Sequence, residues 1–375
     1  MGFYVRAVVY YIMDTPQYTF LLPAYKSKYF AEALRSIKKI FQLSVTSAEY
    51  NMRPLVSVII PNYCHARYLD QRIQSVLNQT YQNFEVIILD DCSPDDGASM
   101  AVIEQFRPNP HVSHIVYNKE NSGSTFKQWQ NGISLAKGEI IWIAESDDYC
   151  SKDFLQKVME CWEWYPDCSI VQTASCRVNS VGEEIFPDCI YSGKRSHAKG
   201  RDFIQYNMLC SNFHIPNASA VTFRREYIEM LPNDYMSYKS AGDRLFWIYM
   251  LEHGNICTID APLNFFRNHE SKVSPQKELD GTQCRENYKI NRYLHKKGYV
   301  TGVLRLVEYT YYWKYINSFH FDTEDTKKDL MKLWFPRWWM GRTTVSIAER
   351  LIKWRGMVTT LHIYFNRNVR QWISC

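Results

Sequence analysis

Short apolar segments alternate with amphipathic segments from residue 55 onward. Apolar runs at 56–60, 85–89 and 139–144 predict buried strands, and the spacing of Leu69, Ile73, Val76 and Leu77 predicts a helix between the first two. Further strands are expected at 114–117, 169–174, 220–223 and 263–266, and further helices at 98–106, 124–137, 152–164 and 244–253. Non-alternating strands separated by helices predict an α/β fold whose mostly parallel sheet is covered on both faces.

The same pattern divides the chain into three parts. Residues 1–53 give no clear domain signal beyond a helical lead-in at 27–43. Residues 54–275 contain the alternating strands and helices and form the expected catalytic domain. Residues 276–375 read as a helical extension, with breaks at Pro336 and Gly341.

Acidic side chains follow two of the predicted strands directly. Asp90 and Asp91 end one strand, and Glu145, Asp147 and Asp148 end another. Ligands of parallel sheets bind beyond the carboxyl ends of the strands, where these residues gather. Crowded carboxylates stay ionised only beside a cation or dedicated hydrogen-bond donors, so the pattern indicates an enzyme.

The cysteine content and the lengths of the apolar runs indicate the cellular compartment. The eleven cysteines include no CxxC pair and total an odd number, so neither a zinc knuckle nor a disulfide framework is indicated, and a reducing cytosol fits best. No run of about 18 apolar residues could span a bilayer. We therefore expect a cytoplasmic protein.

Positive charge is concentrated in the tail. From Lys327 onward ten basic residues oppose two acidic ones, giving +8, whereas the rest of the chain carries −3. Aromatic residues are interleaved with these charges, as at 334–339, 353–355 and 370–372. Such a segment suits the inner face of an anionic membrane, or else forms a helical appendage that packs on the body. No recognition module for nucleic acid accompanies the charge.

Five sequence blocks, in order, resemble those of glycosyltransferase family 2. They read SVIIPNY, VIILDDCSPDDG, NSGST with GISLAKGEIIWIAESDDY, SAGDRLFWIYMLEHG, and FFRNHESKVS, and together they cover about 54–275. The resemblance implies a GT-A, Rossmann-like fold with the helical extension appended. It also implies an inverting enzyme that takes a sugar from a nucleotide-sugar donor with Mg²⁺ or Mn²⁺ as cofactor.

The acidic block after 139–144 then receives roles by resemblance. Asp148 is the expected metal ligand, and Asp147 is expected to contact the ribose or sugar of the donor. Glu145 replaces a shorter acidic residue and is expected to lie farther from the cation. The R-x-H element places Arg267 near the diphosphate and His269 near the cation or a phosphate.

The nucleotide is expected to lie against the first two strand ends. By resemblance Asp91 accepts a hydrogen bond from a pyrimidine ring N–H, which favours a UDP-linked donor, while Asp90 caps a helix or braces the sheet. Pro61 and Tyr63 shape the base pocket, although Pro61 also fits a plain turn at the strand end. Ser93 and Lys127 are also expected to contact the donor. As alternatives, Ser93 could cap a helix, and Lys127 could lie on a solvated helix face.

Asp243, in AGDRLFW, is the expected catalytic base for the acceptor hydroxyl. An aspartate ahead of an apolar helix is also an ordinary N-cap. The family block usually has a glutamate before this aspartate, and Gly242 stands in its place. The carboxylate expected to assist the base is therefore missing from this position. Residues 200–220, with Asn212, His214 and Asn217, are expected to border the sugar and acceptor.

The acceptor is expected to be a glycan or lipid-linked saccharide in bacterial surface-polysaccharide assembly, such as capsule or O-antigen. Two rivals remain. A sugar-phosphate nucleotidyltransferase should open with a glycine-rich loop, but PNYCHARYL contains no glycine. A non-catalytic sugar- or membrane-binding protein with the same fold is the second rival.

Overall fold

A computed structural model describes residues 53–210, 215, 217–269 and 274–335. The lead-in helix expected within 1–53 and the basic aromatic tail from 336 lie outside the described residues, as do Asn212 and His214. The described residues from Pro54 to Phe335 form one compact unit.

The predicted parallel sheet is present in four strands with the order β3-β2-β1-β4. These strands are β1 (Val56–Asn62), β2 (Phe84–Asp90), β3 (Val112–Tyr117) and β4 (Ile140–Ile143). In their register Val58 lies beside Val86 on one side and beside Trp142 on the other. Because all four strands run in the same direction, their carboxyl ends meet at one edge.

The other half of the sheet contains strands of both directions. It consists of β8 (Val221–Arg224), β6 (Cys168–Val178), β9 (Asn255–Arg267), β5 (Tyr149–Cys150) and β7 (Arg195–Ala198). β8 runs antiparallel to both β4 and β6, whereas β9 runs parallel to β6 and pairs antiparallel with β5 and β7. Through β5 and β9, the segment ending at Arg267 comes beside the acidic loop that follows β4.

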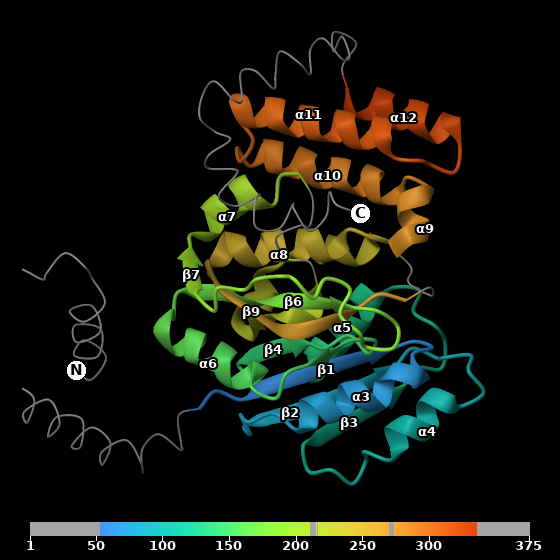
Figure 1. The fold of residues 1–375 in the computed structure, drawn as a ribbon, viewed down its shortest axis with the longest axis vertical. Coiled ribbons are helices and arrows are strands. Elements are labelled where there is room, and N and C mark those ends of the chain that lie inside the picture. The colour runs from blue at the N-terminus through green and yellow to red at the C-terminus, as the bar shows by residue number, and fades with distance from the viewer. Residues whose placement is uncertain (1–52, 211–214, 216, 270–273, 336–375) are drawn as a thin grey trace, which may run out of the picture. The chain divides into compact units, whose positions relative to one another are not determined.

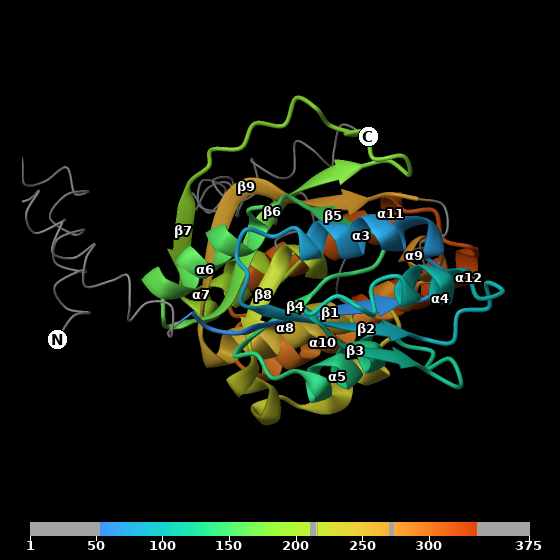
Figure 2. The ribbon, with the colours of Figure 1, turned by 90° about the horizontal axis from the view of Figure 1, so that it is seen from below.

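Two layers of helices cover the sheet. One layer holds α3 (Ala66–Leu77), α4 (Ala98–Glu104) and α6 (Phe154–Trp164); the other holds α5 (Thr125–Leu135), α7 (Gly200–Asn207) and α8 (Gly242–His253). Figure 2 shows α3 and α5 on opposite sides of the parallel strands. Successive strand residues separate accordingly, since Val58 and Ile60 belong to the first core and Ile59 to the second.

The described residues also form three short 3₁₀ helices between α7 and α8, and four α-helices after the last strand. The former are η4 (Ala218–Ala220), η5 (Arg225–Met230) and η6 (Asn233–Ser237), and the latter are α9 (Ser274–Leu279), α10 (Thr282–Lys296), α11 (Val303–Ser318) and α12 (Glu324–Trp334). In Figure 1, α10 lies between α8 and the pair α11 and α12. Among the described residues, no helix has both the length and the apolar composition required to cross a bilayer.

The C-terminal helices share a core with the sheet. Ile290 and Leu294 of α10 and Leu304 of α11 belong to the same buried cluster as Ile59 of β1. A smaller cluster joins the outer helices, where Trp334 stacks on Tyr312 with ring centroids 3.6 Å apart. Apolar burial therefore continues without a break from the sheet into α10 and α11.

Close packing of α5 on β1 depends on Gly132. A Cβ atom added there would lie 2.3 Å from Cγ2 of Ile59, and the Ile59 side chain is fully buried. The absence of a side chain at position 132 lets α5 approach the sheet closely.

We predict that Gly132→Ala destabilises the protein, although alanine normally favours a helix by about 0.5–1 kcal/mol over glycine. Overpacking against Ile59 should cost about 1–3 kcal/mol and outweigh that gain. Chemical denaturation should show a lower free energy of unfolding, while Asn131→Ala, at an exposed position of the same helix, should change it little. A more stable Gly132→Ala protein would contradict this packing argument.

Candidate functional site

The loops after β1 and β2 are fastened together by Asp90. Its Oδ1 accepts hydrogen bonds from Asn62 Nδ2 and Ser93 Oγ, both at 2.7 Å, and its Oδ2 accepts one from Ser93 N at 3.0 Å. Ser93 Oγ in turn accepts a hydrogen bond from Cys64 N at 2.9 Å. Asp90 therefore braces the strand ends, and Ser93 connects the two loops.

Asp91 organises the loop that leads into α5. Asn118 Nδ2, Ser122 N and Gln128 Nε2 donate to its Oδ1 at 2.7–2.9 Å, whereas its Oδ2 accepts Ser122 Oγ at 2.7 Å. The residue is 5% exposed. A carboxylate has about four lone-pair sites over its two oxygens, so Oδ1 is fully used and Oδ2 keeps acceptor capacity.

Asp148, the expected metal ligand, is held inside the protein. It is 1% exposed, with Asn217 Nδ2 donating to its Oδ2 at 2.6 Å and Arg267 N donating to its Oδ1 at 2.9 Å. The Arg267 guanidinium is also buried and donates through Nε to the Asp147 carbonyl at 2.8 Å and through NH1 to the Ser180 carbonyl at 3.0 Å. Asp148, Asn217 and Arg267 thus fasten the acidic loop to the end of β9.

Asp147 instead faces two histidines. Its Oδ2 lies 3.0 Å from Nε2 of His269, and one ligand atom from each of His65, Asp147 and His269 falls within 4.8 Å of the others. His65 Nδ1 lies 2.9 Å from Ser146 Oγ. His269, one of the two expected metal ligands, therefore lies beside Asp147 and His65.

Glu145 is in an environment that favours its neutral form. Part of the residue reaches the surface, but protein encloses its carboxyl group. Burial, followed by repulsion from Asp147, raises the pKa of this carboxyl to about 8. Trp129 Nε1 donates to Glu145 Oε1 at 2.9 Å, and Ser219 Oγ accepts from Glu145 N at 3.0 Å.

Asp243 lies in the first turn of α8. The residue before the helix is Ala241, whose side chain provides no cap, so Asp243 is not the N-cap of α8. Its Oδ1 accepts a hydrogen bond from Arg244 N at 2.7 Å. Burial raises the pKa of the Asp243 carboxyl to about 6, which leaves it mostly ionised at neutral pH but a stronger base than a solvated aspartate.

The packing around Gly242 explains the missing glutamate. A Cβ atom at this position would lie 2.5 Å from the Phe126 ring and 2.6 Å from the Tyr235 carbonyl oxygen. A longer side chain cannot be accommodated there without movement of the backbone. Gly242 is therefore required by close packing between α5, η6 and α8.

The N-terminal part of α5 connects the three acidic groups. Gln128 donates a hydrogen bond to Asp91, and Trp129 donates one to Glu145. Phe126 packs against the backbone at Gly242, the residue before Asp243. Trp129 also contacts Phe246 of α8, with ring centroids 5.9 Å apart. The residues that follow β2 and β4, together with the first turn of α8, therefore contact the same segment of α5.

Three other expected residues have different surroundings. Pro61 is buried within β1, next to its end, and Tyr63 just beyond it is 45% exposed. Lys127 is exposed on α5 and its Nζ donates to the Ser122 carbonyl at 3.1 Å. Tyr63 and Lys127 therefore both reach the surface near the Asp91 loop.

Three residues with contacts at this site were not predicted from the sequence. They are His65 beside Asp147, Trp129 bound to Glu145, and Glu286, which binds backbone amides just before Asp243. His65 follows the first strand, so its place beyond a strand end was an available signal. Trp129 has ordinary helical spacing. Glu286 lies far along the chain on α10, and nothing local distinguishes it from a solvated helical glutamate.

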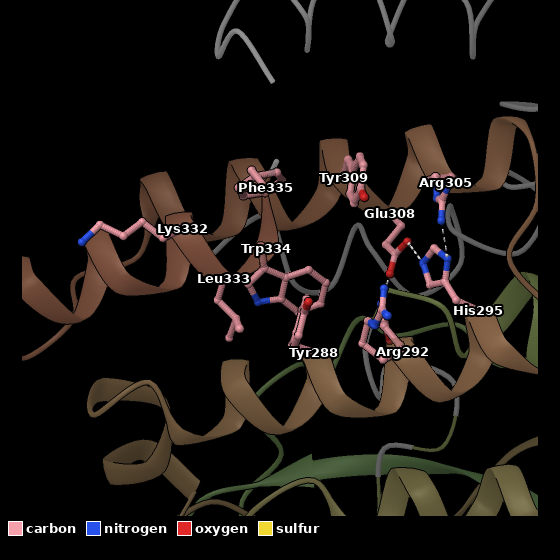
Figure 3. Close-up of a pocket in the computed structure, with 11 residues that line it drawn as sticks. Tyr288, Arg292, His295, Arg305, Glu308, Tyr309, Lys332, Leu333, Trp334 and Phe335 are labelled. Atoms are coloured by element: carbon pink, nitrogen blue, oxygen red, sulfur yellow. Dashed lines mark hydrogen bonds and ion pairs between the residues drawn. The ribbon is translucent and has the colours of Figure 1, made fainter. Parts of the chain in front are cut away.

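A separate cavity of about 270 Å³ lies among α10, α11 and α12 (Figure 3). Arg292, Arg305 and Lys332 contribute to its lining, together with Glu308. Both oxygens of Glu308 are engaged, because Asn291 Nδ2 donates to one at 2.7 Å and His295 Nε2 lies 2.6 Å from the other. None of the strand-end carboxylates belongs to this described lining.

Known proteins similar to this chain include several glycosyltransferases. TuaG of Bacillus subtilis (strain 168), a glycosyltransferase provisionally assigned to teichuronic acid biosynthesis, is 36% identical over 110 residues, which are 29% of this chain and 42% of TuaG. The uncharacterized glycosyltransferase alr2836 of Nostoc sp. is 26% identical over 256 residues, which are 65% of this chain and 77% of that protein. The chain thus spans less than half the length of TuaG.

A crystal structure of S. aureus TarS residues 1–349 with UDP-GlcNAc has 18% identity and a TM-score of 0.49, covering 74% of this chain and 70% of that one. The sequence model described as "Glycosyl transferase family 2" matches residues 57–231. This range includes the strand ends of β1, β2 and β4 with their carboxylates. Residues 57–231 therefore match a glycosyl transferase family 2 domain, as the sequence blocks indicated.

Proposed function

We propose that the protein is an inverting glycosyltransferase that transfers a sugar from a nucleotide-sugar donor to a glycan or lipid-linked acceptor. The observation that carries the proposal is the convergence of Asp91, Glu145 and the Asp243 backbone on α5. The three groups come from three separate family blocks. Their gathering around residues 126–129 supports a single site for donor and acceptor.

Asp91 supports a uracil-containing donor. Its Oδ1 is occupied by protein donors, so the acceptor capacity of Oδ2 is available to a ring N–H of the base. A buried acceptor of this kind favours bases that present such a donor, namely uracil or thymine. Exposed Tyr63 borders the base, and exposed Lys127, on α5 beside this loop, is a cation that can approach a diphosphate.

The interactions of Ser93 and Arg267 give them supporting roles. Ser93 binds Asp90, and Arg267 binds carbonyl groups and the acidic loop. We therefore assign them to holding the loops that surround the donor rather than to direct contact with phosphate. Asp148 also holds this loop through its bonds to Asn217 and Arg267.

The residues that would hold a divalent cation are His65, Asp147 and His269. Their ligand atoms are close enough to share one ion, and the set combines one carboxylate with two imidazoles. Mg²⁺ strongly prefers oxygen ligands, whereas Mn²⁺ accepts both kinds, so this donor set fits Mn²⁺ better. When bound, the cation would neutralise charge on the diphosphate leaving group.

Asp243 performs the proton transfer in this proposal. The acceptor hydroxyl oxygen forms a bond to the anomeric carbon while the bond from that carbon to the diphosphate oxygen breaks. The hydroxyl proton moves to a carboxylate oxygen of Asp243, and the nucleoside diphosphate leaves with the bonding electrons. Configuration inverts because a single displacement occurs and no enzyme nucleophile intervenes.

The setting we propose is the assembly of a bacterial surface polysaccharide. TuaG is assigned to teichuronic acid biosynthesis, which supports an acceptor of this general class. Such assembly uses cytoplasmic nucleotide sugars, so we propose a cytoplasmic site of action, with the basic tail from 336 contacting an anionic membrane. The non-catalytic alternative loses its main support, because packing accounts for Gly242.

We predict that Asp243→Asn lowers transferase turnover by about 100-fold or more, since general-base catalysis typically contributes 10²–10⁴-fold. Donor affinity measured by calorimetry should be unchanged. Asp234→Asn is a suitable control, because Asp234 also lies beside α8 and bonds to Tyr249. Full turnover in the Asp243→Asn protein would remove this residue from the role of base.

We predict that turnover falls as the pH drops through about 6. The raised pKa of Asp243 means that the carboxylate predominates above this value and the protonated form, which cannot accept a proton, predominates below it. Rates at saturating donor should be measured from pH 5 to pH 8, with donor affinity followed at each pH. A rate that is constant across this range, with binding intact, would refute the assignment.

We predict that His269→Ala and Asp147→Asn each weaken Mn²⁺ binding about tenfold or more, because changes even beyond the direct ligands cost about 10–100-fold. Calorimetric titration with MnCl₂, with UDP present, would measure the affinity. His114→Ala changes a histidine whose Nδ1 contacts its neighbour Ser113 and serves as the control. Equal Mn²⁺ affinity in all three variants would contradict the proposed site.

A further inference from the structure

We propose that Glu286, on α10 of the C-terminal extension, is a positioning residue that fixes the backbone from which Asp243 projects. The inference rests on the proposed function, in which Asp243 is the base. It gives the C-terminal helices an indirect part in catalysis, through the position of Asp243, although the family match ends at residue 231.

Glu286 binds three consecutive backbone amides. Lys239 N donates to its Oε1 at 2.6 Å, and Ser240 N and Ala241 N donate to its Oε2 at 2.9 and 2.8 Å. The glutamate is 7% exposed, so these charge-assisted bonds are largely shielded from water. One carboxylate thus holds the whole segment that immediately precedes α8.

This arrangement differs from an ordinary N-cap, because Glu286 binds the amides just before α8 rather than N–H groups within its first turn. Ala241 has no side-chain acceptor, and Gly242 has no side chain. A helix N-terminus presents unpaired N–H groups and a partial positive charge, which an anion stabilises. Glu286 supplies that anion from another helix, and Asp243 is two residues beyond the last amide that it binds.

The residue after Asp243 is also bound to α10. The guanidinium of Arg244 is fully buried and donates to Asn287 Oδ1 at 2.8 Å and to Asn291 Oδ1 at 2.6 Å. Asn291 is fixed in turn by Glu308, whose contact with His295 is visible in Figure 3. Asp243 therefore lies between residues 239–241 and Arg244, which are all bound by side chains of α10.

Two charged groups act directly on Asp243. Beyond the effect of burial, Arg244 on the same helix lowers the pKa of the Asp243 carboxyl, and Glu286 on α10 raises it. Removal of the Glu286 charge should therefore lower this pKa and shift the acid limb of the rate profile to lower pH. A role in stability alone would produce no such shift.

The opposite end of α8 provides a matched control. Glu252 also accepts hydrogen bonds from C-terminal residues, with Tyr293 Oη at 2.6 Å and Tyr299 Oη at 3.2 Å. It joins the same two helices through a carboxylate with several donors, but it lies at the end of α8 remote from Asp243.

The test compares Glu286→Gln with Glu252→Gln in the full chain. We expect Glu286→Gln to reduce kcat about tenfold or more, because small displacements of a catalytic group are costly. KM for the donor should stay within about twofold, since the hydrogen bonds of Glu286 go to the amides at 239–241. A loss confined to kcat marks a group that acts on the transition state. The acid limb should move to lower pH. Glu252→Gln should lower the melting temperature without these kinetic changes.

Hydrogen exchange of the amides at 239–241 provides a readout independent of activity. Exchange should accelerate in Glu286→Gln and remain unchanged in Glu252→Gln. If the wild-type protein shows no turnover with any nucleotide sugar, the proposed function fails, and exchange still decides whether Glu286 holds this segment. Unchanged exchange in Glu286→Gln would overturn the inference.

Glu286→Asp keeps the charge and shortens the side chain, which guards against a Glu286→Gln protein that fails to fold. We expect this variant to have a reduced kcat with the acid limb unshifted. Equal losses of kcat in the Glu286 and Glu252 variants, in proportion to their folded fractions, would show that Glu286 is merely structural.

Discussion

The main constraint on this structure is that several carboxyl groups must be buried near one another at a sheet edge. Repulsion and desolvation both oppose this arrangement, so each group needs donors or must become neutral. Helix α5 supplies two of the donors, Gln128 for Asp91 and Trp129 for Glu145. The close approach of α5 to β1 at Gly132 is what brings these donors within reach.

The acidic groups consequently divide into supporting and reactive ones. Asp90 and Asp148 accept hydrogen bonds at both oxygens, as Asp91 does, and these bonds hold loops in place. Asp147 faces histidines, and Asp243 is buried beside few donors, which makes it basic. The environment, rather than the residue type, determines which carboxylate can bind a cation or accept a proton.

The C-terminal helices belong to the same physical system. They continue the apolar core of the sheet and contribute Glu286, Asn287 and Asn291 to the two segments around Asp243. A base on the first turn of a helix is well placed only if that turn is fixed. In this protein, a helix outside the matched family domain binds the three amides that precede that turn.

Sequence by itself determined the α/β class, the order of most strands and helices, and the placement of acidic residues at strand ends. These features follow from local periodicity, which apolar residues record directly. The blocks around Asp91, Asp147 and Asp243 also indicated the family. Tertiary structure placed Asp147 beside His65 and His269, made Gly242 a packing requirement beside Phe126, and brought α10 against the segment before Asp243. Neighbouring aspartates look alike in sequence, and long-range contacts leave no local pattern, so only packing could distinguish them.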